Sequence, residues 1–327
     1  MKNIFAVFLM VLVCSCLSNR KTSETKAVIE KPEITEEAIK TSMEYLASDE
    51  LEGRATGSEG LEKAAVFIEN YLKSNDIKPY FETYRDSFKV NDLDGYNIVG
   101  MVEGNDPKLK NEFVILGGHY DHIGIQKTVE GDSIANGAND DASGTVAAME
   151  LGRYFAKSKT NKRSLLITLY DAEELGLKGA ANLAERLKGE NFDAYTMINF
   201  EMIGVARAES EAMAYMSGYE RSNFAETLNS YADEEIIGFF PKAKAMNLFF
   251  RSDNFPFYKA LDIPAHAIST FDFTNFDYYH HVEDEADKMD YAHMAHFIKK
   301  MIPALEGMMN APTKDVLLKE EAVIEDE

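Results

Sequence analysis

The chain has 327 residues, of which 45% are hydrophobic, 28% charged and 11% aromatic. This composition is that of a globular protein with an ample core, and it excludes a fibrous or disordered chain. Asp and Glu outnumber Lys and Arg by 56 to 34, so the formal net charge is -22. Such a surface repels polyphosphates, and we expect no nucleic-acid partner. The two cysteines lie near the N-terminus, which excludes a disulfide-stapled fold.

Residues 1–18 have the features of an export signal. Lys2 supplies a positive charge, and residues 4–13 form an unbroken apolar run. Because a bilayer span needs about 20 apolar residues, this run has the length of a signal-peptide core. The run ends in VCSC, which resembles a bacterial lipobox with Cys16 as its last residue.

The lipobox predicts that residues 1–15 are a cleaved signal peptide and that Cys16 carries a lipid. An ordinary signal peptide cut nearby, or an uncleaved anchor, is the alternative. We therefore expect an exported, lipid-anchored protein, periplasmic or associated with the outer membrane.

The remaining chain divides into three predicted parts. Residues 16–33 are polar and aperiodic, as in a flexible tether. Residues 34–310 carry the periodic apolar patterns of a folded domain, and residues 311–327 form an acidic tail. The sequence leaves the oligomeric state open.

Helical spacing of apolar residues predicts a series of helices, the first with Thr35 as its N-cap. The predicted helices are residues 35–47, 61–73, 143–157, 178–188, 222–232, 253–261 and 290–308. Short apolar runs typical of strands are residues 96–101, 113–116, 165–170, 197–200, 213–216 and 265–269. This alternation predicts a single-domain α/β fold with a mostly parallel central sheet flanked by helices.

In such a sheet, ligands bind beyond the carboxyl ends of the strands. Residues able to bind a metal or move a proton follow the predicted strands or open a helix: His119, Asp121, Asp140, Glu173, Glu174, Glu201, Tyr279, His280 and His281. Converging carboxylates repel one another unless a cation neutralises them. Two imidazoles with several carboxylates suit Zn²⁺ or a similar first-row divalent ion.

Neighbouring residues suggest a division of roles within this cluster. Glu173 and Glu174 are adjacent, so in an extended segment their side chains point in different directions. One of them can bind metal while the other acts as general base. Asp121, two residues after His119, is placed to orient that imidazole.

Six motifs then carry a family resemblance: GGHYDH, GANDDASG, DAEELGLKGA, NFEMIG, RSDNFPF and YYHHVED. In order and spacing they resemble the zinc-dependent exopeptidases of family M28, the co-catalytic di-zinc aminopeptidases. The stretch LASDELEGRATGSEG at residues 46–60 is similar to their N-terminal lead-in. The resemblance covers residues 35–305, and it implies the zinc-exopeptidase fold, of the phosphorylase/hydrolase-like class.

The resemblance also implies roles for the site residues and two zinc ions per chain. Asp140 bridges both ions. His119 and Glu201 complete one set of ligands, and Glu174 and His280 complete the other. Glu173 is the general base.

Three further positions bear on these implied roles. His280 is chosen over His281 because the family histidine precedes an Asp by four residues, here Asp284. Glu201 stands where many members have Asp, and Asn254 stands where the family has His. Tyr279 is a candidate to stabilise the oxyanion of the transition state.

The sequence thus predicts a metallo-aminopeptidase that removes N-terminal residues from peptides through a metal-activated water. A glutaminyl cyclase-like acyltransferase with a single zinc, a non-catalytic binding protein on the same fold, and a metallo-carboxypeptidase are the alternatives. The preferred N-terminal residue, the physiological substrate and the native metal stay open.

Overall fold

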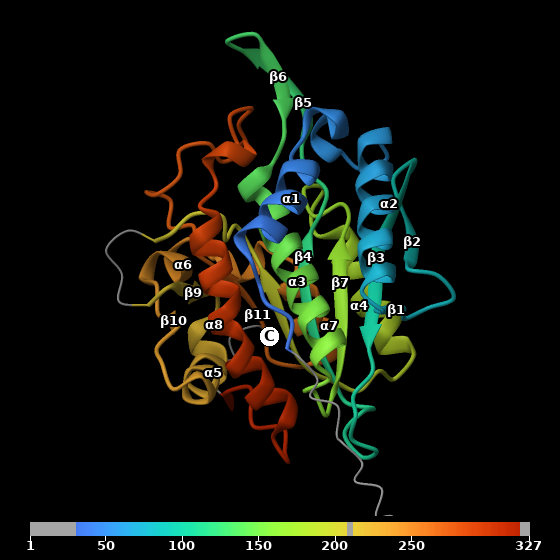
Figure 1. Cartoon of the computed structure of the whole chain (residues 1–327), viewed down its shortest axis with the longest axis vertical. Coiled ribbons are helices and arrows are strands. Elements are labelled where there is room, and N and C mark those ends of the chain that lie inside the picture. The colour runs from blue at the N-terminus through green and yellow to red at the C-terminus, as the bar shows by residue number, and fades with distance from the viewer. Residues whose placement is uncertain (1–30, 208–211, 321–327) are drawn as a thin grey trace, which may run out of the picture. The chain divides into compact units, whose positions relative to one another are not determined.

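A nine-stranded sheet runs through the part of the chain that the structure describes, residues 31–207 and 212–320 (Figure 1). The structure is a computed structural model. The predicted signal peptide, Cys16 and the tether up to residue 30 lie outside the described residues.

The strands are β1 (Lys78–Pro79), β2 (Arg85–Val90), β3 (Leu93–Val102), β4 (Phe113–His119), β5 (Gly124–Val129), β6 (Asp132–Ala135), β7 (Ser164–Tyr170), β8 (Ala194–Phe200), β9 (Ala214–Met216), β10 (Ile237–Gly238) and β11 (Ala265–Ser269). The large sheet has the order β1-β3-β7-β4-β8-β11-β9-β10, and β2 pairs with β3. Strands β5 and β6 pair separately.

The four central strands, β7, β4, β8 and β11, are parallel to one another. Strand β3 is antiparallel to β7, and β9 is antiparallel to β11. Every residue of β7 and β8 is buried, as expected for parallel strands covered on both faces. The predicted mostly parallel sheet is confirmed, and the carboxyl ends of its four central strands meet at one edge.

The helices are α1 (Glu36–Leu46), α2 (Glu59–Ser74), α3 (Ser143–Ser158), α4 (Lys178–Gly189), α5 (Phe224–Ala232), α6 (Pro241–Ala245), α7 (Asn254–Leu261) and α8 (Tyr291–Asn310). Helices α1, α2, α3, α5 and α8 bury their apolar faces in one core, in front of the sheet in Figure 1. Helices α4 and α7 form a second core on the opposite face.

All the predicted helices and strands are present, with ends that differ by at most three residues. The Thr35 hydroxyl accepts a hydrogen bond from the Ala38 N–H at 3.2 Å, which confirms the N-cap. The sequence analysis did not predict strands β1, β2, β5, β6 and β10 or helix α6. Strands β1 and β10 have two residues each, and β5 is mostly exposed, so neither length nor an apolar run marks them.

The folded unit continues past the predicted boundary at residue 310. The Ala311 carbonyl accepts a hydrogen bond from the Arg163 guanidinium at 2.7 Å, and Val316 is buried. The Lys319 N–H donates to the Arg221 carbonyl at 2.8 Å. Residues 311–320 therefore pack against the domain, and residues 321–327 of the predicted tail lie outside the described residues. Among the helices of the described ranges, none combines the length and apolar character that crossing a bilayer requires.

Candidate metal centre

The side chains predicted to bind metal meet at the carboxyl edge of the sheet. His119 is the last residue of β4, Glu174 follows β7, and Glu201 follows β8 directly. Asp140 lies in the short helical segment Ala138–Ala142 that leads into α3, and His280 lies in the loop after β11. The fold thus brings together residues spread over 162 positions of the chain, from 119 to 280.

Two groups of donor atoms share Asp140. In the first, called here the Glu201 set, His119 Nε2 lies 3.1 Å from Asp140 Oδ1 and 3.5 Å from Glu201 Oε1. In the second, the Glu174 set, His280 Nε2 lies 3.1 Å from both Asp140 Oδ2 and Glu174 Oε2. The two oxygens of the Asp140 carboxylate therefore face different groups, as a bridging ligand requires.

The donor atoms fit divalent metal ions. Ligand atoms bonded at about 2.0–2.1 Å to a tetrahedral zinc ion lie roughly 3.3 Å from one another, close to the separations observed here. His119 Nε2, Asp140 Oδ2 and Glu174 Oε1 are buried and have no hydrogen-bond partner among the described residues. Buried polar atoms without partners are costly, and one cation bound in each set would satisfy them.

The pKa values show how strongly these groups interact. Burial alone would lower the pKa of His119, but Glu173, Asp121 and the other surrounding carboxylates raise it well above its ordinary value. The pKa of His280 is raised to about 10 by the adjacent carboxylates of Asp140 and Glu174. The cluster therefore favours positive charge at its centre, as a cation site does.

Two buried aspartates position the ligand loops. Asp284 accepts hydrogen bonds from the backbone N–H groups of Asn139, at 2.7 Å, and Asp140, at 3.0 Å. Asp141 accepts from the N–H of His119 at 3.2 Å and from that of Met202, next to Glu201, at 2.9 Å. These contacts tie the segments before α3 and after β4, β8 and β11 to one another.

Asp121 contacts both His119 and the Glu173-Glu174 pair. Its backbone carbonyl lies 3.1 Å from His119 Nδ1, while its carboxylate is farther away at 3.5 Å. The carboxylate oxygens accept the backbone N–H groups of Glu173 at 3.1 Å and Glu174 at 3.3 Å. The backbone of Asp121 is therefore the closer contact of the imidazole, and its carboxylate holds the two glutamates in place.

Glu173 and Tyr279 border the cluster without joining either set. Glu173 Oε2 lies 4.0 Å from His119 Nε2, and burial raises the pKa of Glu173 well above its usual range. The Tyr279 ring stacks on His280 with ring centres 4.1 Å apart, and the side chain is 43% exposed. Burial and the nearby carboxylates raise the pKa of Tyr279, so its hydroxyl stays protonated and able to donate.

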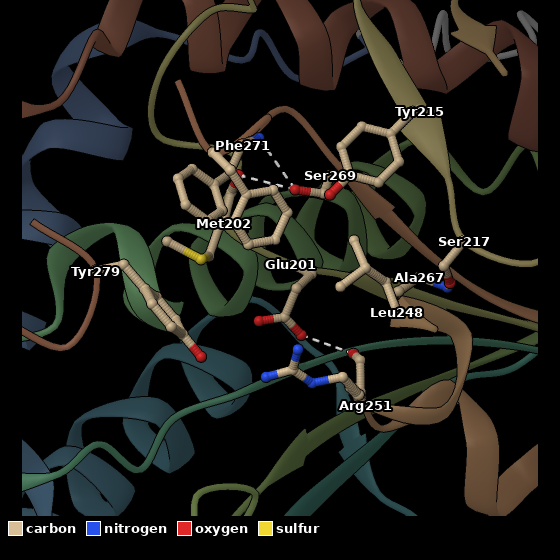
Figure 2. Close-up of a pocket in the computed structure, with 12 residues that line it drawn as sticks. Glu201, Met202, Tyr215, Ser217, Leu248, Arg251, Ala267, Ser269, Phe271 and Tyr279 are labelled. Carbon is tan, nitrogen blue, oxygen red and sulfur yellow. Dashed lines mark hydrogen bonds between the residues drawn. The ribbon is translucent and has the colours of Figure 1, made fainter. Parts of the chain in front are cut away.

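A cavity of about 90 Å³ opens beside Glu201. Figure 2 shows the Glu201 carboxylate, the Tyr279 hydroxyl and the Arg251 guanidinium on the same side of it. Aromatic and aliphatic side chains form much of its wall: Met202, Tyr215, Leu248, Ala267, Phe271 and Phe273. The cavity thus joins the Glu201 set to a largely apolar recess.

Sequence reasoning missed two buried residues of the site. His122 lies three residues after His119, with its Nδ1 3.1 Å from Glu174 Oε1. Arg54 is fully buried and donates hydrogen bonds to the carbonyls of Tyr120 at 2.7 Å and Gly137 at 2.9 Å. The motif GGHYDH contained a signal for His122, a second histidine beside the first, whereas Arg54 looked like part of a glycine-rich surface loop.

The fold and these two donor sets define an α/β protein with two candidate groups of metal ligands. The sequence model of peptidase family M28 matches residues 97–305. The chain belongs to this family, and the family predicted from the sequence motifs is confirmed.

A curated relative adds to this comparison. The chain is 37% identical over 112 residues to a probable zinc metalloprotease of Pyrenophora tritici-repentis, which covers 34% of this chain and 25% of that protein. The chain thus matches about a quarter of that relative's length.

Solved structures share the fold with different activities. A zinc aminopeptidase from Bacillus subtilis superposes with a TM-score of 0.65 at 14% identity, over 88% of this chain and 99% of that one. A glutaminyl cyclase from Fimbriiglobus ruber gives 0.65 at 17% identity, over 86% and 96%. At such identities the likeness shows the fold alone.

Proposed function

We propose that the chain is a zinc-dependent aminopeptidase that hydrolyses N-terminal residues from peptides with two zinc ions. The observation that carries the proposal is the Asp140 carboxylate, whose two oxygens each face a separate set of metal ligands. Glu173, whose side chain is 13% exposed, lies beside this centre and outside both sets. Together they supply the parts that metal-assisted hydrolysis needs.

In this mechanism Asp140, His119 and Glu201 hold one ion, and Asp140, Glu174 and His280 hold the other. Bound zinc would supply Lewis-acid polarisation of the scissile carbonyl and would acidify water at neutral pH. Glu173 accepts the proton of the attacking water and delivers it to the departing amine. The Tyr279 hydroxyl donates a hydrogen bond to the oxygen that becomes negative in the transition state.

The surroundings of the centre support an N-terminal substrate. The cavity beside Glu201 has a largely apolar wall, which suits the side chain of a terminal residue. A peptide's α-amino group is partly or fully cationic near neutral pH, and the carboxylates of the cluster and the net charge of -22 attract it.

A glutaminyl cyclase-like reaction is the second candidate, because such enzymes share this fold. A single-zinc cyclase needs one set of ligands, whereas this chain presents two sets with a shared carboxylate. The two sets favour hydrolysis.

Metal removal tests the proposal. The purified chain should contain close to two zinc ions and hydrolyse aminoacyl anilides, fastest for apolar N-terminal residues because of the cavity wall. Chelation should abolish hydrolysis, and added zinc should restore it. Metal analysis with the anilide panel before and after chelation is the measurement. One zinc per chain without anilide hydrolysis, together with cyclisation of N-terminal glutamine, would favour the second candidate.

We also propose that the chain is exported and held on a membrane by a lipid on Cys16. The support is the apolar run of residues 4–13 followed by VCSC. In a bacterial host the full chain should sediment with membranes, and Cys16→Ser should move it to the soluble fraction. Fractionation with N-terminal peptide mass analysis checks this. A mature N-terminal peptide that carries no lipid mass on Cys16 would contradict lipidation at this residue.

A further inference from the structure

His122 is a buried histidine that the mechanism above does not use. Its side chain is 1% exposed, and neither ring nitrogen has a hydrogen-bond partner among the described residues. Leaving a buried polar group unsatisfied destabilises the folded state. The backbone holds it there, because the His122 N–H donates to the Arg54 carbonyl at 3.1 Å.

The ring of His122 faces the Glu174 set. Its Nδ1 lies 3.1 Å from Glu174 Oε1 and 3.9 Å from Asp140 Oδ2. The His280 ring lies on the other side of the same carboxylates, with the two ring centres 5.7 Å apart and the planes at 74°. Glu174 thus lies between two imidazoles, and one ligand atom each from His122, Asp140 and Glu174 lie within 4.8 Å of one another.

We propose that His122 binds, through Nδ1, the metal ion held by Asp140, Glu174 and His280. The inference rests on the two-ion site of the proposed function. It gives the Glu174 set four protein ligands, two imidazoles and two carboxylates, which is a complete tetrahedral shell for zinc. The Glu201 set keeps three protein ligands.

The different numbers of protein ligands indicate different roles for the metal ions in the Glu174 set and the Glu201 set. Zinc sites with four protein ligands are closed and structural, whereas catalytic sites keep a position for water or substrate. The cavity provides independent support, because it is lined by Glu201 and Tyr279 and by no ligand of the Glu174 set. Substrate therefore approaches on the Glu201 side, and His122 strengthens the ion that stays in place.

The test isolates the Glu174 set by removing Glu201. In Glu201→Ala, X-ray absorption should count two imidazoles on the single bound zinc, and His122→Leu in the same background should leave one. Zinc affinity, measured by chelator competition, should fall by more than the roughly 10–100-fold that loss of a residue supporting a ligand costs. His296→Leu, which replaces an exposed histidine on α8, is the matched control and should change neither value.

His122→Asn separates a metal ligand from a residue that only positions Glu174. The Asn amide can donate a hydrogen bond to the Glu174 carboxylate, as a residue that positions Glu174 would, but it is a poor zinc ligand. Affinity should stay low in His122→Asn if His122 binds the metal, and should return if the residue merely positions Glu174. This variant also carries the comparison if circular dichroism shows that His122→Leu does not fold.

One imidazole in Glu201→Ala, or an unchanged affinity in both His122 variants, would overturn the inference. Failure of the proposed function has a different signature, namely a wild-type chain that binds less than two zinc ions or leaves the anilides intact. The imidazole count does not depend on hydrolysis, so the two failures are distinguishable.

Discussion

Glu173→Gln should lower kcat by about 10²–10⁴ and leave the zinc content unchanged, because the side chain moves a proton without binding metal. Glu173 lies 4.0 Å from His119 Nε2, outside both sets of ligands, and its N–H is held by Asp121. Gln has the same size and keeps these backbone contacts, but its amide cannot accept the proton from water. Steady-state kinetics and metal analysis of the same preparation check both parts.

Glu174→Gln is the matched control for this change. It alters the neighbouring residue in the same way, but Glu174 lies 3.1 Å from His280 Nε2 within a set of ligands. We therefore expect this variant to lose zinc as well as activity. If Glu173→Gln lost zinc to the same extent, Glu173 would be a metal ligand, and the base would have to be sought elsewhere.

Arg54→Met should lower the free energy of unfolding by about 3–5 kcal/mol, the range found when one partner of a buried charged contact is removed. The buried guanidinium donates to the carbonyls of Tyr120, Asn136, Gly137 and Leu46, all of which would lose a partner. Burial lowers the pKa of Arg54 only to about 10, so it remains charged at neutral pH. Urea unfolding of the chelated protein measures this effect apart from metal binding.

Two further variants define the cause of that loss. Arg54→Lys keeps the charge but not the planar fork of donors, so it should recover only part of the stability. Arg85→Met removes a partly exposed arginine that pairs with Glu62 and Glu69, and each such pair is worth about 0–1 kcal/mol. Equal losses in Arg54→Met and Arg85→Met would show that the buried carbonyl contacts do not govern stability.

The sequence predicted the central fold because its strands are buried on both faces and read as continuous apolar runs. Residues 165–170 and 265–269 were found in this way, and the site residues followed from their positions after such runs. The antiparallel direction of β3 and β9 depends on long-range pairing, which apolar patterns do not encode.

Within the site, the contacts that the sequence analysis did not predict also depend on long-range pairing. The carboxylate of Asp121, predicted to orient His119, lies 3.5 Å from His119 Nδ1. It also accepts the N–H groups of Glu173 and Glu174, 52 and 53 residues away, which the sequence did not indicate. His122 and Arg54 also gain their importance from contacts with distant segments. Local spacing identifies the types of residue in a site, whereas their partners depend on the tertiary fold.

The strand order determines which parts of the sheet and of the candidate metal site can form first while the chain is being synthesised. Strand β9 pairs only with β10 and β11 among the described strands, so it joins the sheet only after residues 265–269 have been made. Asp140 likewise waits for Asp284 to hold its backbone, and the Glu174 set waits for His280. The ligands of the Glu201 set have all been made once residue 201 is translated, whereas the Glu174 set stays incomplete until residue 280. We therefore expect the Glu174 set to bind its metal only after most of the domain has been translated, so this ion cannot guide the early steps of folding.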